Sequence, residues 1–287
     1  MTGAAPSLRG ETAVLATMHG KERAIAPLLA RLLGVRVVVP EDFDTDRFGT
    51  FSRDVARTGT PLETARAKIA AGFERVPDAR LGLASEGSFG PHPQVPFVSW
   101  GSEQVVLVDR ATGLELVGRH EAPAAHFVHA QVDDVDAARA FAARVGFPRQ
   151  GVIVMGVVDG QPSPAVALAK DAYDDHTLVA AVRRVLDICG AASVETDMRA
   201  HRNPQRMRCI RRATVDLLRA WRSPCPACAR PGFVVNARLP GRPCGWCGAP
   251  TRQVLADERR CAGCGHLERR PRDDGPADPA HCDACNP

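Results

Sequence analysis

Apolar runs and regularly spaced apolar positions follow one another along the first 222 residues. Runs at 12–18 and 35–39 predict buried strands, and apolar residues three to four positions apart within 21–33 predict an amphipathic helix between them. A third apolar run, 81–84, predicts another buried strand. The β-α-β order of the first three elements indicates a parallel start to a sheet.

The segment 41–61 is polar and charged and contains two glycines, which predicts an irregular loop. Thr60 is a favourable N-cap next to a proline, so we expect a helix over 61–73. Apolar runs at 105–109 and 114–117 are separated by a short turn and predict a hairpin. Residues 1–122 are therefore expected to form one α/β segment.

A second α/β segment is expected over 123–222. Short apolar runs predict strands at 127–132, 152–158, 165–169 and 193–196. Helical spacing predicts helices at 135–145, 176–189 and 204–221, and Asn203 is a favourable N-cap for the last of them. The two segments together predict an α/β fold, three-layer-like in each segment, with a mixed sheet.

Eight of the ten cysteines follow residue 222 and form four Cys-x-x-Cys pairs. The pairs are Cys225/Cys228, Cys244/Cys247, Cys261/Cys264 and Cys282/Cys285. Fifteen residues separate the first two pairs and seventeen separate the last two, which is zinc-ribbon spacing. A two-residue gap lets both thiolates of one tight turn reach the same tetrahedral ion. We therefore expect residues 223–287 to form a double zinc-ribbon module with two structural zinc ions.

Two alternatives concern these cysteines. A disulfide framework is disfavoured because residues 1–11 show no secretory signal pattern and paired knuckles are poor disulfide partners. Within the zinc interpretation, we expect neighbouring knuckles to pair in sequence, with a cross-braced arrangement as the alternative. The two remaining cysteines, Cys189 and Cys209, lie in apolar helical patterns and are expected to be buried and unreactive.

Composition restricts the function classes. The formal net charge is +4, too small to indicate a nucleic-acid-binding protein by itself. Residues 223–287 contain nine arginines, seven acidic residues and two aromatic ones, so we expect the module to be structural or to bind a protein, with RNA as the alternative partner. No apolar run approaches the roughly 18 residues of a membrane span, which predicts a cytoplasmic protein without a membrane partner.

Lysine is rare in this chain. Of 37 basic residues, only Lys21, Lys68 and Lys170 are lysines. A strong arginine bias is typical of a GC-rich genome. A lysine that persists against this bias indicates a position where a compact ammonium group is needed.

Three groups of residues predict a site for a phosphorylated ligand. The first group, Thr17, His19 and Lys21, lies where the first strand ends and the first helix begins. Backbone N–H groups at a helix N-terminus together with a lysine can bind phosphate. An ordinary strand–helix turn is the alternative.

The second group combines the helix 61–73 with the residues after the strand 81–84. Its members are Glu63, Lys68, Glu86, Ser88 and His92. We expect Glu86, Ser88 and His92 to lie in a loop rich in Gly, Ser and Pro. In open α/β sheets, catalytic and ligand-binding residues are often found in such loops. Two carboxylates at such an edge can hold Mg²⁺ together with substrate phosphates. A solvated surface turn is the alternative.

The third group surrounds the start of the helix 204–221. Its basic members are Arg199, His201, Arg202 and Arg206. Cations are unfavourable at the positive end of a helix dipole unless an anion compensates them. A bound phosphate or carboxylate would do so, and the nearby Glu195 and Asp197 are the alternative. Lys170 follows another strand and is expected at the same cleft.

The segments 16–21, 84–93 and 196–207, with the terminal cysteine knuckles, resemble an uncharacterised bacterial domain-of-unknown-function family over essentially the whole chain. That resemblance implies a fold arrangement and no activity. Residues 12–118 also resemble the inosine/xanthosine triphosphatase superfamily. In that superfamily a strand ends in a Ser/Thr-x-Asn-x-x-Lys turn, a later helix carries Glu followed by Lys or Arg, and the next strand ends in an acidic Gly-rich loop.

In this sequence Thr17 with Lys21, Glu63 with Lys68, and Glu86 occupy those places. The resemblance implies that Lys21 contacts phosphate, that Glu63 and Glu86 hold Mg²⁺, and that a metal-bound water attacks phosphorus. The chain departs from the pattern in two ways: a histidine replaces the asparagine, and the loop has one acidic residue rather than two.

The leading hypothesis is a metal-assisted hydrolase or transferase that acts on a phosphorylated, nucleotide-like substrate, similar to a magnesium-dependent nucleotide pyrophosphatase. Its cleft would lie between the two α/β segments. The alternative is a non-catalytic protein that binds an anion or RNA and carries a zinc-ribbon docking module.

Overall fold

The computed structural model describes residues 7–50, 55–56, 59–124 and 127–287. The chain divides into two compact units, a larger one, Leu8–Leu218, and a smaller one that contains Arg219–Pro287. Residues 1–6, part of the segment without a secretory signal pattern, lie outside the described residues. The same holds for residues 51–54 and 57–58 of the predicted loop 41–61.

The larger unit begins with a five-stranded mixed sheet of order β2-β1-β3-β4-β5. The strands are β1 (Thr12–Leu15), β2 (Arg36–Val38), β3 (Leu81–Pro91), β4 (Ser99–Asp109) and β5 (Leu114–Pro123). β1 pairs in parallel with β2 and β3, whereas β4 pairs antiparallel with both β3 and β5. The predicted parallel start, the hairpin and the mixed sheet are confirmed.

β3 is longer than predicted. It continues beyond residue 84 to Pro91, because its backbone stays paired with β4 along its whole length. The expected loop position of Glu86 is therefore wrong: Glu86 lies within a strand, opposite Gln104 of β4, and the next pair is Gly87 with Glu103. Ladder pairing with a neighbouring strand decides where such a strand ends, and apolar patterning does not report it.

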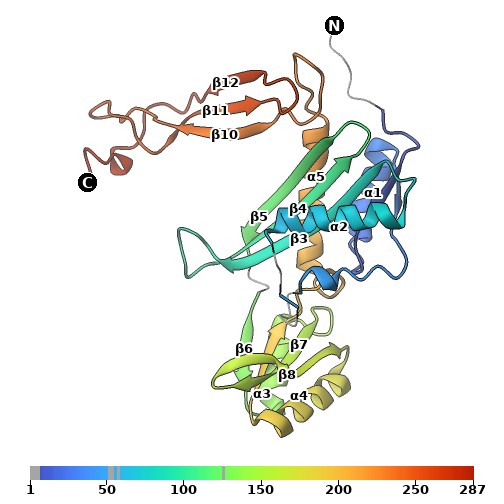
Figure 1. Ribbon diagram of the computed structural model, residues 1–287. Helices are drawn as coiled ribbons and strands as arrows, with labels where there is room; N and C mark the ends of the chain where they lie inside the picture. Colours follow the sequence, from blue (N-terminus) through green and yellow to red (C-terminus); the bar gives the residue numbers. More distant parts are fainter. Residues whose placement is uncertain (1–6, 51–54, 57–58, 125–126) are drawn as a thin grey trace. The chain divides into compact units, whose positions relative to one another are not determined.

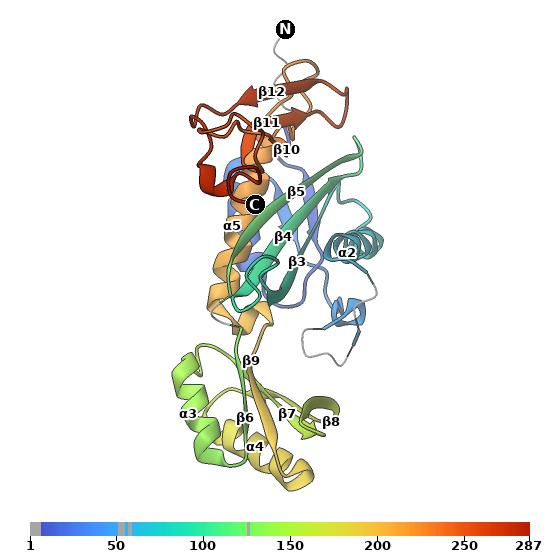
Figure 2. The same cartoon turned by 90° about the vertical axis from the view of Figure 1, so that its left-hand side faces the viewer.

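Three helices pack against this sheet. They are α1 (Glu22–Leu33), α2 (Pro61–Arg75) and α5 (Pro204–Trp221). α2 covers one face of the sheet, and α1 and α5 cover the other (Figures 1 and 2). The predicted cap of α2 is confirmed, because the Thr60 side chain and Glu63 form a capping box. The predicted cap of α5 is also confirmed, since the Arg206 N–H donates to Asn203 Oδ1 at 2.9 Å.

α5 follows the second sheet in sequence but packs on β5 of the first sheet. A Cβ atom placed on Gly118 of β5 would lie 2.2 Å from the Ala213 carbonyl oxygen and 2.3 Å from the Leu217 nitrogen. Only glycine permits so close an approach of a strand to a helix backbone. This contact holds the second half of α5 against β5, and Arg206, nearer the start of the helix, pairs with Glu103 of β4.

The second sheet has four antiparallel strands in the order β6-β9-β7-β8. The strands are β6 (His129–Val132), β7 (Val152–Val158), β8 (Gln161–Ala172) and β9 (Ala192–Thr196). The helices α3 (Val135–Val145) and α4 (Asp175–Cys189) share an apolar core with it, centred on Phe141, Leu178 and Val182. All predicted helices of this segment are confirmed, and the predicted strand 165–169 is the central part of β8.

The smaller unit contains a three-stranded antiparallel sheet of order β10-β11-β12. Its strands are β10 (Val235–Pro240), β11 (Val254–Arg260) and β12 (Leu267–Pro271). The apolar core of this unit is small and consists of Phe233 between Cys225 and Cys261. Among the described residues of the whole chain, no helix combines the length and apolarity needed to cross a bilayer.

Candidate functional site

Two groups of four cysteines converge in the smaller unit. One group is Cys225, Cys228, Cys261 and Cys264, and the other is Cys244, Cys247, Cys282 and Cys285. Sulfur–sulfur distances within the groups include values of 3.6 to 3.8 Å. Four thiolates at about 2.3 Å from one tetrahedral zinc ion lie roughly 3.8 Å apart, whereas the sulfurs of a disulfide lie about 2.05 Å apart. The donor sets can therefore hold two zinc ions and do not form disulfides.

The knuckles are cross-braced, so the predicted sequential pairing is wrong. The first knuckle joins the third, and the second joins the fourth. The antiparallel sheet explains this, because it returns the chain to the same end after every second strand. The start of β10 lies beside the end of β11, which brings the first and third knuckles together, and the ends of β10 and β12 bring the second and fourth together.

Backbone N–H groups support the thiolates. The N–H groups of Cys247 and Trp246 lower the pKa of Cys244 to about 7, and the Trp246 nitrogen lies 3.4 Å from that sulfur. The Gly263 nitrogen lies at the same distance from the Cys261 sulfur. Such bonds favour the charged thiolate and orient it toward the metal. Four cysteine ligands leave no open coordination position, which is characteristic of a structural site.

The surface of the zinc module offers little free positive charge. Six of its nine arginines form ion pairs with carboxylates of the same module. Arg272 and Asp257, for example, form a pair at 2.9 Å. Arginines that are already neutralised are poor donors to a phosphate backbone.

The larger unit contains a small polar cavity of about 30 Å³, here named the lysine cavity. It is lined by Ala16, Thr17, His19, Lys21, Thr45, Asp46, Gly49, Thr50, Lys68, Glu86, Arg199 and Arg206. These residues come from the β1–α1 turn, the segment before α2, α2 itself, β3, and the segment that leads into α5. A cavity of this size holds about one or two water-sized groups.

Buried ion pairs form one wall of the lysine cavity. Lys68 Nζ donates to Glu86 Oε1 at 2.5 Å, and Arg206 Nε donates to Glu103 Oε1 at 2.5 Å. All four side chains are at most 8% exposed. A Cβ atom on Gly87 would lie 2.6 Å from Glu103 Oε1, so this strand position must be glycine for the second pair to fit.

Lys21 differs from the other two cations. It is 7% exposed, and its ammonium donates to a neutral group, the backbone carbonyl of Ser85. Burial lowers the pKa of Lys21 to about 8; Glu86 opposes this shift, and Arg206 and Lys68 reinforce it. The buried cluster therefore contains three basic side chains and only two carboxylates.

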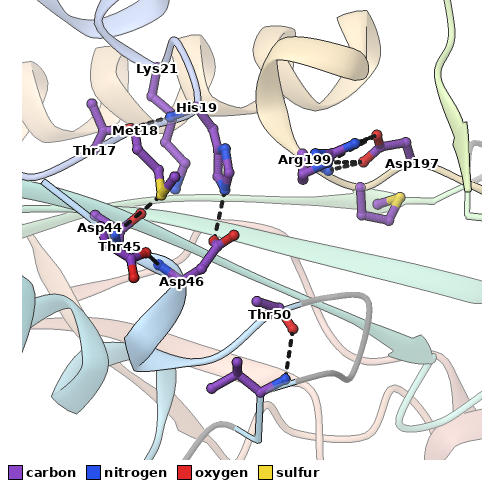
Figure 3. Close-up of polar contacts among 12 residues, drawn as sticks. Thr17, Met18, His19, Lys21, Asp44, Thr45, Asp46, Thr50, Asp197 and Arg199 are labelled. Carbon is purple, nitrogen blue, oxygen red and sulfur yellow. Dashed lines mark hydrogen bonds and ion pairs between the residues drawn. The ribbon is translucent and has the colours of Figure 1, made fainter. Parts of the chain in front are cut away.

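Two histidines and an ion pair lie at the rim. His19 Nε2 lies 2.9 Å from Asp46 Oδ1 (Figure 3). The His19 ring stacks on His201, with 5.3 Å between the ring centroids. Burial lowers the pKa of His201, and the neighbouring His19 lowers it further. Arg199 is held beside Asp197, with Nη2 2.8 Å from Oδ2 (Figure 3).

The start of α1 contributes less than predicted. The N–H groups of Arg23 and Ala24 donate to the carbonyls of Gly20 and Lys21 within the turn. They are thus not available to an anion. Charged side chains, rather than these first-turn amides, supply the positive charge of the lysine cavity.

The structure brings together seven of the residues predicted for the cleft. Those that line the lysine cavity are Thr17, His19, Lys21, Lys68, Glu86, Arg199 and Arg206. Those that do not line it are Glu63, Ser88, His92, Lys170, His201 and Arg202.

Three of the residues outside the lysine cavity, Glu63, His92 and Arg202, form contacts elsewhere. Glu63 accepts a hydrogen bond from the Thr60 N–H at 2.8 Å as part of the α2 capping box. The His92 ring packs edge-on against Trp100 with 4.6 Å between the centroids. Arg202 donates to the Ala172 carbonyl, and its guanidinium lies 4.5 Å from the centre of the Tyr173 ring.

The geometry gives no support to the predicted magnesium site. Glu63 is committed to its capping box, and Glu86 is paired with Lys68. Across the part of the chain that the structure describes, only the two cysteine groups bring three or more potential ligand atoms together. A magnesium ion would have to displace Lys68 from its carboxylate partner.

Sequence reasoning missed Glu103 and Asp46. Glu103 has the same strand parity as Val105 and Leu107, which are buried, so it was a carboxylate at an inward position. That pattern could have identified it. Asp46 lies in a short 3₁₀ turn, Asp46–Phe48, within the predicted irregular loop, where no pattern indicates a partner.

Comparison with known proteins places the chain in a family. A search of curated proteins found no match. The sequence model of a domain of unknown function, DUF6671, matches residues 72–287, which include β3 to β5, the second sheet, α5 and both cysteine groups. The resemblance to the inosine/xanthosine triphosphatase superfamily is not confirmed by this match and stays a prediction. The match covers most of the sequence, and the chain belongs to the DUF6671 family.

Proposed function

We propose that the protein binds the phosphate group of a small phosphorylated ligand in the lysine cavity. The excess of buried positive charge carries this proposal. Glu86 accepts a hydrogen bond from Lys68 and Glu103 accepts one from Arg206, while Lys21 donates to the neutral carbonyl of Ser85. Glu86 and Glu103 also act on Lys21, but three buried cations that share two carboxylates keep an excess positive charge, which is costly in a protein interior. An anion beside Lys21 would remove that cost.

The distribution of lysine supports the same function. Two of the three lysines in a chain with 37 basic residues line this one cavity. A compact ammonium group takes up less of a cavity of about 30 Å³ than a guanidinium plane does. The same volume admits about one or two oxygens of a phosphate head group, so the remainder of the ligand would lie outside the cavity.

Binding is favoured over metal-assisted hydrolysis. The leading catalytic hypothesis requires Glu63 and Glu86 as metal ligands, and both are engaged elsewhere. The zinc module serves as a structural appendage in this proposal, and its paired arginines favour a protein partner over RNA.

The test measures binding of inorganic phosphate and pyrophosphate to the full-length, zinc-loaded protein by isothermal titration calorimetry. We expect Lys21→Met to weaken binding at least tenfold. Lys170→Met is the matched control, since it removes the same charge from the same unit outside the lysine cavity, and it should change affinity less than twofold. Affinity should also fall above about pH 8, where Lys21 loses its proton.

Two results would overturn this proposal. One is a wild-type protein that binds neither anion at millimolar concentration. The other is an equal loss of affinity in the Lys21→Met and Lys170→Met variants, which would indicate nonspecific attraction.

A further inference from the structure

A second cavity of the larger unit has a different character. Its volume is about 550 Å³. It is lined by Val128, Arg144, Val145, Gly146, Arg149, Gln150, Thr196, Pro204, Gln205 and Arg208. None of these residues lines the lysine cavity. We name it the arginine cavity for its three arginines, Arg144, Arg149 and Arg208.

The arginine cavity has no acidic residue in its lining. Its three arginines are exposed, and among the described residues none of the three pairs with a carboxylate. By contrast, Arg139 on the same helix as Arg144 pairs with Asp175 at 2.6 Å. Three like charges around one cavity repel each other until an anion enters, and guanidinium groups bind phosphate oxygens in a bidentate manner.

The backbone around the arginine cavity is fixed by hydrogen bonds. The buried Gln150 side-chain amide donates to the carbonyls of Gly151 at 3.0 Å and Asp197 at 3.2 Å. Thr196 Oγ1 accepts from the Val128 N–H at 3.2 Å and donates to the Val128 carbonyl at 3.1 Å. Because this part of the wall is already ordered, little further conformational entropy is lost when a ligand binds.

Size and lining indicate the class of ligand. A volume of about 550 Å³ lies within the roughly 300–1,000 Å³ typical of small-molecule sites. Val128, Val145 and Pro204 provide apolar surface for the body of a ligand, and the arginines provide for several negative charges. α5 begins at this cavity, and its first turn contains no acidic residue that would neutralise the positive end of the helix dipole. That end of the dipole also favours negative charge in the cavity.

We infer that the arginine cavity binds a small organic molecule with two or more phosphate charges, such as a nucleoside diphosphate. This site is separate from the proposed phosphate site in the lysine cavity. Its volume suits a whole small molecule, whereas the lysine cavity admits only part of a phosphate group. A nucleic acid strand is less well matched, because no aromatic side chain lines the arginine cavity for base stacking.

The experiment titrates the full-length, zinc-loaded protein with adenosine diphosphate, pyrophosphate and a single-stranded RNA of 20 nucleotides. We expect adenosine diphosphate to bind, and the double variant Arg149→Met/Arg208→Met to weaken that binding at least tenfold. Arg183→Met is the matched control, because Arg183 is an exposed arginine of α4 outside the cavity. It should change affinity less than twofold.

Lys21→Met separates this inference from the proposed function. It should leave the affinity of the arginine cavity for adenosine diphosphate unchanged while it weakens phosphate binding by the lysine cavity at least tenfold. The inference is overturned if adenosine diphosphate does not bind, if Arg183→Met weakens binding as much as the double variant, or if Lys21→Met alone abolishes it. Tighter binding of the RNA, lost in the double variant, would show that the occupant is a nucleic acid instead.

Discussion

The two units of the chain place their charges in opposite ways. In the larger unit, the pairs Lys68–Glu86 and Arg206–Glu103 each join a helix to the sheet, and their side chains are buried. In the zinc module, each of the arginine–carboxylate ion pairs described above has at least one side chain that is more than 30% exposed, and in Arg252–Asp283 the two side chains are 85% and 71% exposed. Charges are costly in a protein interior and nearly neutral in energy on a surface.

This difference indicates which of the two units is the better candidate for a ligand-binding site. The zinc module has a small apolar core, so zinc held by the two cysteine groups would supply most of its stability, and its surface charges keep it solvated. The larger unit has an extensive apolar core and yet buries charged side chains inside it, among them the three cations and two carboxylates at the lysine cavity. Such a cluster reduces stability unless a ligand uses it, which makes the lysine cavity the stronger candidate for a binding site.

The largest predicted effect concerns the stability of the zinc module. Removing zinc with a chelator should unfold residues 223–287 and leave the larger unit folded, because structural zinc contributes on the order of 10 kcal/mol or more in zinc-finger peptides. Limited proteolysis should then cut within the module, and circular dichroism should retain the helical signal. Loss of the helical signal together with the module would contradict the idea of separate stabilisation.

Pairs of substitutions test the cross-braced arrangement in the same experiment. Cys228→Ser with Cys264→Ser removes two ligands of one site, so native mass spectrometry should find one zinc ion per chain. Cys228→Ser with Cys247→Ser affects both sites and should leave none. Sequential pairing would give the opposite pattern.

How much the sequence predicted differs between the same two regions. All eight members of the two cysteine groups were identified from the sequence, because Cys-x-x-Cys spacing is characteristic of zinc ligands. Their partners were predicted incorrectly, because the pairing depends on a three-stranded sheet that the spacing does not reveal. The elements of the larger unit were predicted well where apolar periodicity was strong, as in the helices 135–145 and 204–221.

The lysine cavity was predicted only in part. Thr17, Lys21 and Glu86 were found because each follows or extends an apolar strand. Glu103 was missed because its partner Arg206 is 103 positions away, and only the packing of α5 on β5 brings the two together. Long-range pairs of this kind depend on tertiary packing, which local patterns do not encode.

The next prediction compares an ion pair from each unit. Arg206→Met leaves Glu103 buried without its cation and should destabilise the larger unit by about 3–5 kcal/mol. Arg252→Met, the matched control on the surface of the zinc module, should change stability by less than about 1 kcal/mol. Urea denaturation followed by circular dichroism measures both.

A rescue variant tests whether charge is the cause. Arg206→Met combined with Glu103→Leu replaces the buried pair by apolar side chains and should recover much of the lost stability. If the double variant is as unstable as Arg206→Met alone, lost packing around Arg206 explains the effect. Equal effects of Arg206→Met and Arg252→Met would remove the contrast between the two units.

The smallest predicted effect is the pH dependence caused by Lys21, and it is absent from the zinc module, which contains no lysine. The pKa of Lys21 is lowered from 10.5 to about 8 in the folded protein. Between these values the unfolded chain binds more protons than the folded one, so stability should rise with pH from about 8 to 10.5. The rise should amount to about 3 kcal/mol relative to Lys21→Met, in which this titration is absent. Urea denaturation of both proteins across this pH range measures the difference. Saturating phosphate should reduce this pH-dependent difference in stability, because an anion beside Lys21 stabilises the ammonium form. If the difference between the two proteins stays constant with pH, Lys21 does not carry the excess charge of the cavity.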